Sequence, residues 1–318
     1  MSQVYLLADV GGTNARFVVL TTPRRGLSQK GVLTLKSKDF SDFSSLLLEA
    51  LSFFKVEPRD TVACIAVAGP VFKGRAKLTN LGWEIEERKI KVKFPFKKLI
   101  LVNDLFAGSA SLAKLKKKDL KLVKKGRIDK GVWVAIFCGT GLGVGVLVKE
   151  KPLTLISTEA GHIFFQALDS FDLKFLDFLK EKQKELSYEE VLSGRGLENL
   201  YEFFHAGERL SAPMITALAK MQDKRAGQAV KTYFKYLGRF CSQLALCYLP
   251  LGGLYLSGGV INALIDFLFE KEHKSVFMEN FVSSSRLNFL LEELPIYAIG
   301  HPFPVLLGCK AIVESLED

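Results

Sequence analysis

Apolar residues in this chain gather in short runs that are joined by polar, glycine-containing turns. Near the N-terminus one run ends at Asp9-Val10, the turn Gly11-Gly12-Thr13-Asn14 follows, and a second run continues to Leu20. The same order returns around the turn Gly139-Thr140-Gly141. Two apolar runs joined by such a turn predict a β-hairpin. We therefore expect the same hairpin device twice in one chain.

A glycine-containing hairpin turn leaves its backbone N–H groups uncovered, and a threonine hydroxyl adds a further donor. Such a turn can bind an anion, and two turns that face each other would hold a polyphosphate. Either turn alone is equally compatible with a tight turn of purely structural value. The repetition, together with the carboxylate of Asp9 at the end of the first strand, favours the phosphate-binding interpretation.

The apolar pattern predicts a similar succession of elements in both halves of the chain. The elements predicted in the first half are strands near 4–9, 15–21, 31–36, 62–68 and 99–103, and a helix near 41–54. The order restarts from residue 132, with strands near 132–138, 143–149, 152–157 and 253–257. We therefore expect an internally duplicated α/β chain. No low-complexity linker separates the halves, so a shared hinge is expected between them.

Length and composition are those of a globular protein with room for two domains. The chain has 318 residues, 48% of them hydrophobic and 25% charged, which allows a substantial core and a cleft between lobes. The most membrane-like stretch, 244–269, contains Pro250, Asp266 and two glycine pairs. It is better interpreted as a helix, a buried strand and a second helix. No signal-peptide pattern opens the chain, which indicates a cytoplasmic protein.

The cysteines and the excess of basic residues are both interpreted as ordinary features. Five cysteines without paired spacing are expected to be reduced core residues: Cys64, Cys138, Cys241, Cys247 and Cys309. The formal charge is +10, and basic residues concentrate in segment 114–130. Because no aromatic residue interleaves with them, we interpret this segment as a solvated surface. The net charge would attract anionic nucleotides over long range, and we expect no nucleic-acid or membrane partner.

A carboxylate at the end of a predicted strand is the first candidate for catalysis. Asn103-Asp104 closes an apolar strand and precedes a helix-like run. Open α/β sheets bind ligands at the carboxyl ends of their strands, and phosphoryl transfer to an alcohol needs a base for the hydroxyl proton. Aspartate at a strand-to-helix junction also serves as a helix N-cap. That structural role of Asp104 stays open as the alternative.

Further polar and glycine residues suit a sugar and a nucleotide. Glu159-Ala160-Gly161-His162 follows a predicted strand, and Glu189 lies further along the chain. Their side chains can hydrogen-bond to sugar hydroxyls, although isolated residues of these types often have structural or surface roles. No additional ligands support a zinc site at Glu159 and His162. Gly258-Gly259 ends another strand, where glycine either admits a flat ring such as adenine or serves strand–helix packing.

These segments together resemble the bacterial glucokinase family, in the hexokinase and actin-like ATPase superfamily, over essentially the whole chain. Each motif is short, but their order along the chain is specific. The motifs are Asp9–Arg16, Ala68-Gly69-Pro70, Leu78-Thr79-Asn80, Val102-Asn103-Asp104, Gly139–Gly143, Glu159-x-Gly161-His162, Val191–Gly194 and Ser257-Gly258-Gly259. Ala160 departs from the family pattern, which usually has glycine there. The cysteine-rich zinc motif of the related repressor/open-reading-frame/kinase group is absent.

The resemblance implies an α/β, two-lobed actin-like ATPase (ribonuclease H-like) fold with a ligand cleft between the lobes. A small lobe would comprise residues 1–108 joined by the C-terminal helix 299–318, and a large lobe would comprise 109–298. It also implies that Asp104 is the catalytic base for the sugar 6-hydroxyl. Asp9 would hold Mg²⁺, directly or through water.

The remaining implied roles concern the two substrates. The implied sugar ligands are Asn103, Glu159, His162, Glu189 and Asn80. The residues implied to hold ATP are Asp9, Gly11, Gly12, Thr13, Asn14, Gly139, Thr140, Gly141, Gly258 and Gly259. The activity implied is transfer of the γ-phosphoryl of ATP to the 6-hydroxyl of glucose, the first step of glycolysis.

Two alternatives to this activity stay open. One is a kinase for another hexose, such as mannose, fructose or an amino sugar. The other is a sugar sensor without turnover, which would need the sugar ligands but not the base Asp104. The sequence does not determine the strictness of hexose selectivity, ADP or polyphosphate as the donor, formation of a homodimer, or allosteric control.

Overall fold

The computed structural model describes residues 3–21, 31–78, 80–282 and 286–317, so Thr79 of the Leu78-Thr79-Asn80 motif lies outside the described residues. The chain forms two compact units. Unit 1 contains Met1–Lys117, Leu147–Ile156 and His301–Asp318, and unit 2 contains Lys118–Val146 and Ser157–Gly300. The lobe boundaries expected from the sequence, which placed 147–156 in the large lobe, stay a prediction about domains.

Unit 1 is built on a five-stranded sheet in the order β3-β2-β1-β4-β8. The strands are β1 (Val4–Val10), β2 (Asn14–Leu20), β3 (Leu33–Lys36), β4 (Thr61–Val67) and β8 (Lys98–Asn103). β2 pairs antiparallel with β1 and β3, whereas β1, β4 and β8 are parallel. A small antiparallel sheet joins β5 (Val71–Phe72), β6 (Arg75–Leu78) and β7 (Trp83–Glu86). The hairpin predicted around residues 11–14 is confirmed.

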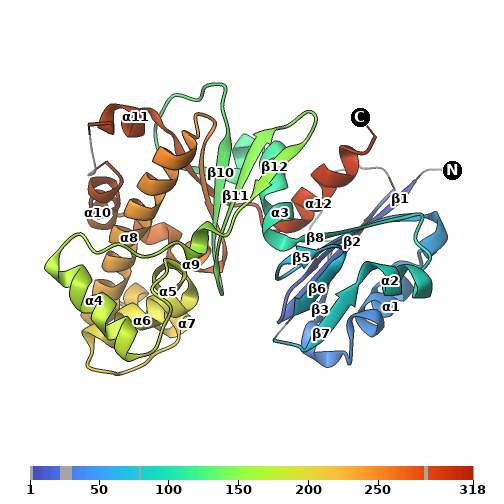
Figure 1. Ribbon diagram of the computed structural model, residues 1–318, viewed down its shortest axis with the longest axis horizontal. Coiled ribbons are helices and arrows are strands. Elements are labelled where there is room, and N and C mark those ends of the chain that lie inside the picture. The colour runs from blue at the N-terminus through green and yellow to red at the C-terminus, as the bar shows by residue number, and fades with distance from the viewer. Residues whose placement is uncertain (1–2, 22–30, 79, 283–285, 318) are drawn as a thin grey trace. The chain divides into compact units, whose positions relative to one another are not determined.

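Side chains alternate along each strand, so apolar residues point to both faces of this sheet. Helices cover both faces. Leu6 and Ala8 of β1 enter a core with α1 (Phe43–Phe54) and α2 (Glu87–Lys93). Leu7 enters a second core with α3 (Asp104–Ala110) and α12 (Pro304–Glu314), on the other face (Figure 1). A Cβ atom at Gly308 of α12 would lie 1.5 Å from the Ala107 carbonyl oxygen, so only glycine permits this close contact with α3. The C-terminal helix thereby fixes α3.

The six-stranded sheet has the order β12-β11-β10-β13-β14-β9. Its strands are β9 (Leu120–Lys124), β10 (Trp133–Cys138), β11 (Leu142–Lys149), β12 (Thr154–Ser157), β13 (Gly253–Ser257) and β14 (Ile296–Ile299). Its first five strands repeat the order of the unit 1 sheet, which confirms the predicted internal duplication. The described helices of unit 2 are α4 (Ser170–Glu181), α5 (Glu189–Leu192), α6 (Gly194–Phe204), α7 (Ala212–Lys220), α8 (Lys224–Tyr248), α9 (Gly259–Leu268), α10 (Lys271–Phe281) and α11 (Asn288–Glu293).

Two expectations about surface and core need correction. The basic segment 114–130 is not uniformly solvated, because its residues 120–124 form the edge strand β9. Lys124 there is buried, and its Nζ donates 2.9 Å to the Leu294 carbonyl, which supplies the acceptor that a buried ammonium needs. Cys247, expected in the core, is exposed near the end of α8, whereas the other four cysteines are buried and all five are free.

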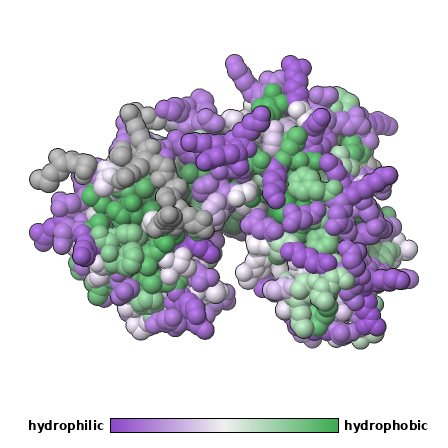
Figure 2. Space-filling view, turned by 180° about the vertical axis from the view of Figure 1, so that it is seen from behind, coloured by the Kyte–Doolittle hydropathy of each residue, from purple (hydrophilic) through white to green (hydrophobic). Residues whose placement is uncertain are grey.

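The stretch 244–269 contains the end of α8, the strand β13 and the whole of helix α9, as predicted. Within the described residues, no helix has the length and apolar character needed to cross a membrane. The space-filling view shows mostly hydrophilic side chains on the face drawn, with smaller hydrophobic areas between them (Figure 2). This distribution is ordinary for a globular protein surface.

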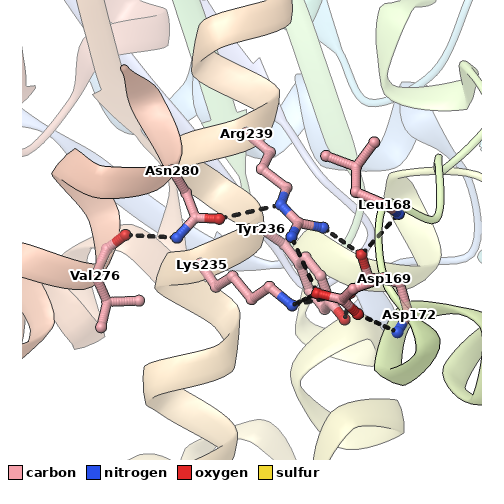
Figure 3. Close-up of polar contacts among 8 residues, drawn as sticks. All are labelled: Leu168, Asp169, Asp172, Lys235, Tyr236, Arg239, Val276 and Asn280. Atoms are coloured by element: carbon pink, nitrogen blue, oxygen red, sulfur yellow. Dashed lines mark hydrogen bonds and ion pairs between the residues drawn. The ribbon is translucent and has the colours of Figure 1, made fainter. Parts of the chain in front are cut away.

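A buried ion network joins α4 to α8 in unit 2 (Figure 3). The fully buried Asp172 accepts hydrogen bonds from Arg239 and from Tyr236, the latter at 2.9 Å, and Lys235 lies 3.0 Å away. Asp172 also accepts a hydrogen bond from the Leu168 N–H, in the segment before α4, at 2.9 Å. Burial raises the pKa of Asp172, but the Leu168 N–H and the Arg239 guanidinium together outweigh burial and hold this pKa below its ordinary value. The network therefore anchors the segment that leads into α4.

Candidate active site

The carboxyl ends of three strands meet at one edge of the unit 1 sheet. Val10 of β1 pairs with Val67 of β4, and Val67 pairs with Asn103 of β8. Because these parallel strands end in register, the segments that follow them lie side by side. They are the turn 11–14, the Ala68-Gly69 turn and the start of α3. This edge is where ligands bind in open α/β sheets.

The 11–14 turn is closed by its own backbone and is bonded to Ser37, the residue that follows β3. Gly11 N–H donates 3.0 Å to the Asn14 carbonyl, and the Ser37 hydroxyl donates 2.7 Å to the Gly11 carbonyl. Thr13 is exposed. A Cβ atom at Gly12 would lie 3.4 Å from Cβ of Asn80, so Asn80 borders the turn. The turn thus presents an exposed hydroxyl and uncovered backbone beside a polar side chain.

Asp104 is held by its neighbour Asn103. The helix-capping role that the sequence allowed for Asp104 belongs to Asn103. The N-cap of α3 is Asn103, whose Oδ1 accepts from the N–H groups of Leu105 and Phe106, at 2.9 and 3.1 Å. Its amide donates 2.8 Å to the Gly69 carbonyl and 3.1 Å to Oδ1 of Asp104. The alternative that made Asp104 the cap is therefore wrong, because the preceding side chain already satisfies those helix donors.

Asp104 is half-buried, and burial raises its pKa to about 7, with a further contribution from the negative charge of Asp9. The Leu105 N–H, 2.9 Å from Oδ1, acts in the opposite direction. A carboxylate with a pKa near neutrality can take up a proton during a reaction and release it afterwards. Asp104 therefore has the environment of a general base.

Asp9 faces Arg16 across the first hairpin. The two residues are a register pair of β1 and β2, and Nη1 of Arg16 lies 3.3 Å from Oδ2 of Asp9. Burial raises the pKa of Asp9, and the arginine charge partly offsets this. Mg²⁺ prefers carboxylate oxygens, and in phosphate-binding sites it is held by one or two carboxylates together with the substrate. Asp9 fits such a role, and no cluster of three His, Cys, Asp or Glu residues suited to a metal occurs among the described residues.

The second turn, 139–141, lies at the end of β10 in unit 2 beside the end of β13. Gly139 N–H donates 2.9 Å to the Gly141 carbonyl, and Thr140 is exposed. The first N–H of α6, from Gly194, donates 2.8 Å to the Gly139 carbonyl. No heavy atom lies within 4 Å of a Cβ position at Gly139. The backbone there is open to a ligand.

Gly258 and Gly259 differ in the space that is available for a side chain. Gly258 has φ of 103°, and a Cβ atom there would lie 2.2 Å from the Cys138 carbonyl oxygen. Strand packing alone therefore demands glycine at 258. Around Gly259, at the start of α9, a Cβ atom would meet no atom within 4 Å. The backbone at Gly259, unlike that at Gly258, is therefore not covered on its Cβ side.

The side chain of Glu189 packs against the 139–141 turn. Its Oε2 accepts 2.9 Å from the Leu142 N–H, and a Cβ atom at Gly141 would lie 2.7 Å from the same oxygen. Its Oε1 accepts 2.7 Å from Nη2 of Arg195. A residue expected to be a sugar ligand is therefore also a structural partner of the expected phosphate turn.

Glu159 precedes the short 3₁₀ turn Ala160–His162, His162 ends it, and both side chains are exposed. Nδ1 of His162 lies 3.2 Å from Glu185. A Cβ atom at Gly161 between them would lie 1.9 Å from the Leu142 carbonyl oxygen, so this glycine lets the turn pack on the start of β11. The structure thus brings Glu159-x-x-His162 beside the strand that follows the 139–141 turn. Ala160 is accommodated in the turn.

The segment between His162 and Glu189 is held by aromatic packing. The ring of Phe165 contacts Tyr188 and Tyr236, with centroids 5.4 and 4.8 Å apart. The Tyr188 hydroxyl accepts 2.9 Å from Gln243 of α8. Since Tyr236 also bonds to Asp172, the α4–α8 ion network supports the same platform.

Sequence reasoning missed two residues of this arrangement, Ser37 and Arg195. Ser37 follows β3, and its bond to Gly11 depends on the pairing of β2 with β3. Arg195 directly follows the Val191–Gly194 motif, in the first turn of α6, but a single arginine at a helix start has no sequence signal that distinguishes it from a surface residue. Glu189 was a candidate from the sequence, but its pairing with Arg195 could be found only from the fold.

Comparison with known proteins decides the family. The family model described as Glucokinase matches residues 6–316. The chain belongs to the glucokinase family. Within this family it is 31% identical to a glucokinase from Colwellia psychrerythraea, covering 98% of this chain and 97% of that protein. It is also 31% identical to a glucokinase from Photorhabdus laumondii, covering 95% and 94%.

Solved structures agree with this family assignment. A glucokinase from an Antarctic psychrotroph superposes with a TM-score of 0.83 at 28% identity, covering 99% of both chains. A Balamuthia mandrillaris glucokinase, solved in complex with glucose, has a TM-score of 0.78 at 21% identity over 98% of this chain and 93% of that one. The chain has the two-lobed actin-like ATPase fold of these sugar kinases.

Proposed function

We propose that this protein is an ATP-dependent glucokinase, which transfers the γ-phosphoryl group of ATP to the 6-hydroxyl of glucose. Its membership of the glucokinase family over residues 6–316 supports this activity. The observation that carries the chemistry is Asp104, a half-buried carboxylate at the carboxyl end of β8 whose pKa is raised to about 7. A sensor without turnover would have no need for a base in this environment.

In the proposed reaction Asp104 accepts the proton of the sugar 6-hydroxyl as the hydroxyl oxygen attacks the γ-phosphorus. The bond from this phosphorus to the oxygen that bridges to the β-phosphate breaks, and ADP leaves with that oxygen. The contacts of Asn103 with Gly69 and with Asp104 hold the base at the start of α3. Since all four hydrogen-bonding positions of the Asn103 amide are used in these contacts and in the helix cap, its assigned role as a sugar ligand requires one of them to be shared.

We assign the other groups as the family resemblance implies. The sugar hydroxyls are bound by Glu159, His162, Glu189 and Asn80, and the nucleotide by the 11–14 and 139–141 turns with Gly258 and Gly259. Asp9 would hold Mg²⁺, directly or through water, and the ion would supply neutralisation of the charge on the transferring phosphate. We place the reaction in the cytoplasm, where free thiols stay reduced.

The proposal is tested with the purified full chain, ATP and MgCl₂, by measuring ADP release in the presence of a panel of hexoses. We expect glucose to give the highest kcat/KM, and mannose, fructose and glucosamine to give lower values. Glucose 6-phosphate should be the product, identified by a coupled dehydrogenase. A higher kcat/KM for another hexose would correct the substrate, and ADP release that no hexose stimulates would contradict the kinase activity.

A further inference from the structure

A negatively charged side chain lies where the ATP phosphates are proposed to bind. The carboxylate of Glu189 touches the 139–141 turn through the Leu142 N–H, and Oε2 is 2.7 Å from the Cβ position of Gly141. Phosphate and carboxylate repel each other, and a nearby pair of like charges is costly at a partly buried site. The Glu189 side chain is only 16% exposed. An anion site at this turn therefore needs a cation that compensates Glu189.

Arg195 is that cation. Its Nη2 donates 2.7 Å to Oε1 of Glu189 and lies 3.4 Å from Oε1 of Glu190. Within the described residues, Arg195 provides the single ion pair of Glu189. Glu190 has a second cation, Lys184 at 3.8 Å, and also accepts from the Asn199 amide at 3.0 Å. Loss of Arg195 would therefore leave Glu189, but not Glu190, without charge compensation.

The position of Arg195 is fixed by the start of α6. Ser193 caps this helix by accepting from the Gly196 N–H, and Gly194 N–H donates 2.8 Å to the Gly139 carbonyl. The same helix start thus holds the turn twice. It contacts Gly139 through the backbone, and it contacts Leu142 through the Arg195–Glu189 pair.

We propose that Arg195 is a positioning residue of the kinase reaction, which neutralises Glu189 and holds its carboxylate against the phosphate-binding turn. The inference rests on the proposed function, because it takes the turn as an ATP site and Glu189 as a sugar ligand. One carboxylate then serves both substrates. Arg195 neutralises the charge of Glu189, which reduces its repulsion of the phosphates, and keeps the carboxylate oriented toward the sugar hydroxyls.

The test is a double-mutant cycle on the full chain, with Arg195→Met, Glu189→Gln and the double variant. Binding of a nonhydrolysable ATP analogue with Mg²⁺, and of glucose, is measured by calorimetry at low and at high salt. Arg195→Met should weaken analogue binding about 5- to 10-fold at low salt, the lower part of the range typical for coupled sites. The loss should shrink at high salt, because it arises from repulsion by Glu189. The KM for ATP should rise with it, and Arg195→Lys should restore most of the affinity.

In the Glu189→Gln background, which has no charge to compensate, Arg195→Met should change analogue binding less than twofold. This non-additivity identifies an effect that passes through Glu189. Arg209→Met is the matched control, because it removes another arginine–glutamate pair, at 3.4 Å to Glu198 of α6, and leaves the Arg195–Glu189 pair in place. It should leave both affinities unchanged.

Equal losses from Arg195→Met in the wild-type and Glu189→Gln backgrounds would overturn the inference, as would unchanged analogue binding in Arg195→Met. Circular dichroism and thermal unfolding establish that each variant is folded before binding is measured. If the wild-type chain binds neither the analogue nor glucose, the proposed function itself fails. That result is distinct from additivity in a wild type that binds both.

Discussion

Asp104 shows how position in the fold changes the chemistry of one side chain. An aspartate in water has a pKa near 4, but the half-buried carboxylate at the start of α3 has its pKa raised to about 7 by burial and by the charge of Asp9. Capping of α3 by Asn103 leaves this carboxylate available. The sequence located Asp104 as a candidate, but it could not separate a base from a cap, because that distinction depends on which of two adjacent side chains turns toward the helix donors.

The raised pKa of Asp104 predicts the pH dependence of activity. A base must be deprotonated, so kcat/KM for glucose should fall below about pH 7 and reach its plateau above pH 8. An acid limb with its midpoint near pH 4 would contradict this environment. The folded state favours the neutral form of Asp104, so the contribution of this residue to stability is lost as pH rises through about 7. Asp104→Asn should therefore be at least as stable as the wild type at pH 8, measured by thermal unfolding.

At the scale of elements, the pattern of apolar runs predicted both hairpins and the repeated strand order. These features are encoded locally, in turns and in alternation along a strand. Three other features were not predictable from the sequence. The edge strand β9 lies in a lysine-rich segment without a clear strand pattern. The α4–α8 network pairs Asp169 and Asp172 with residues more than 60 positions away. Arg195 of α6 bonds to Glu189 of α5, across the break between these two helices. Each depends on tertiary contacts.

The 139–141 turn gives a prediction at this scale. A Cβ atom at Gly139 meets nothing within 4 Å, so Gly139→Ala should fold normally. The added methyl group would stand where the backbone approaches phosphate, so binding of a nonhydrolysable ATP analogue should weaken at least tenfold, about 1.4 kcal/mol. Glucose affinity should change much less.

Gly227→Ala in α8 is the matched control for Gly139→Ala, since a Cβ atom there also meets no atom within 4 Å. Calorimetry should give it wild-type affinity for the analogue. Wild-type affinity in Gly139→Ala as well would reduce the turn to a structural role and remove it from the nucleotide site.

At the scale of the whole molecule, the two larger sheets share one strand order. The 11–14 turn joins β1 to β2 in one sheet, and the 139–141 turn joins β10 to β11 in the other. The duplication was accessible from the repeated order of apolar runs and turns, and the family from eight short motifs that occur in the family order along the chain. The assignment of groups to substrates remains a proposal that depends on one catalytic residue, Asp104.

The most direct test of the account compares glucose 6-phosphate formation by the wild type and by Asp104→Asn at pH 8, with saturating ATP, Mg²⁺ and glucose. Asparagine has the shape of aspartate but cannot accept the hydroxyl proton, and a general base typically contributes a factor of about 10²–10⁴. Calorimetry with glucose and thermal unfolding show whether the variant still binds sugar and folds. We expect a folded, glucose-binding Asp104→Asn variant to lose turnover by about this factor. Turnover close to that of the wild type in such a variant would contradict it.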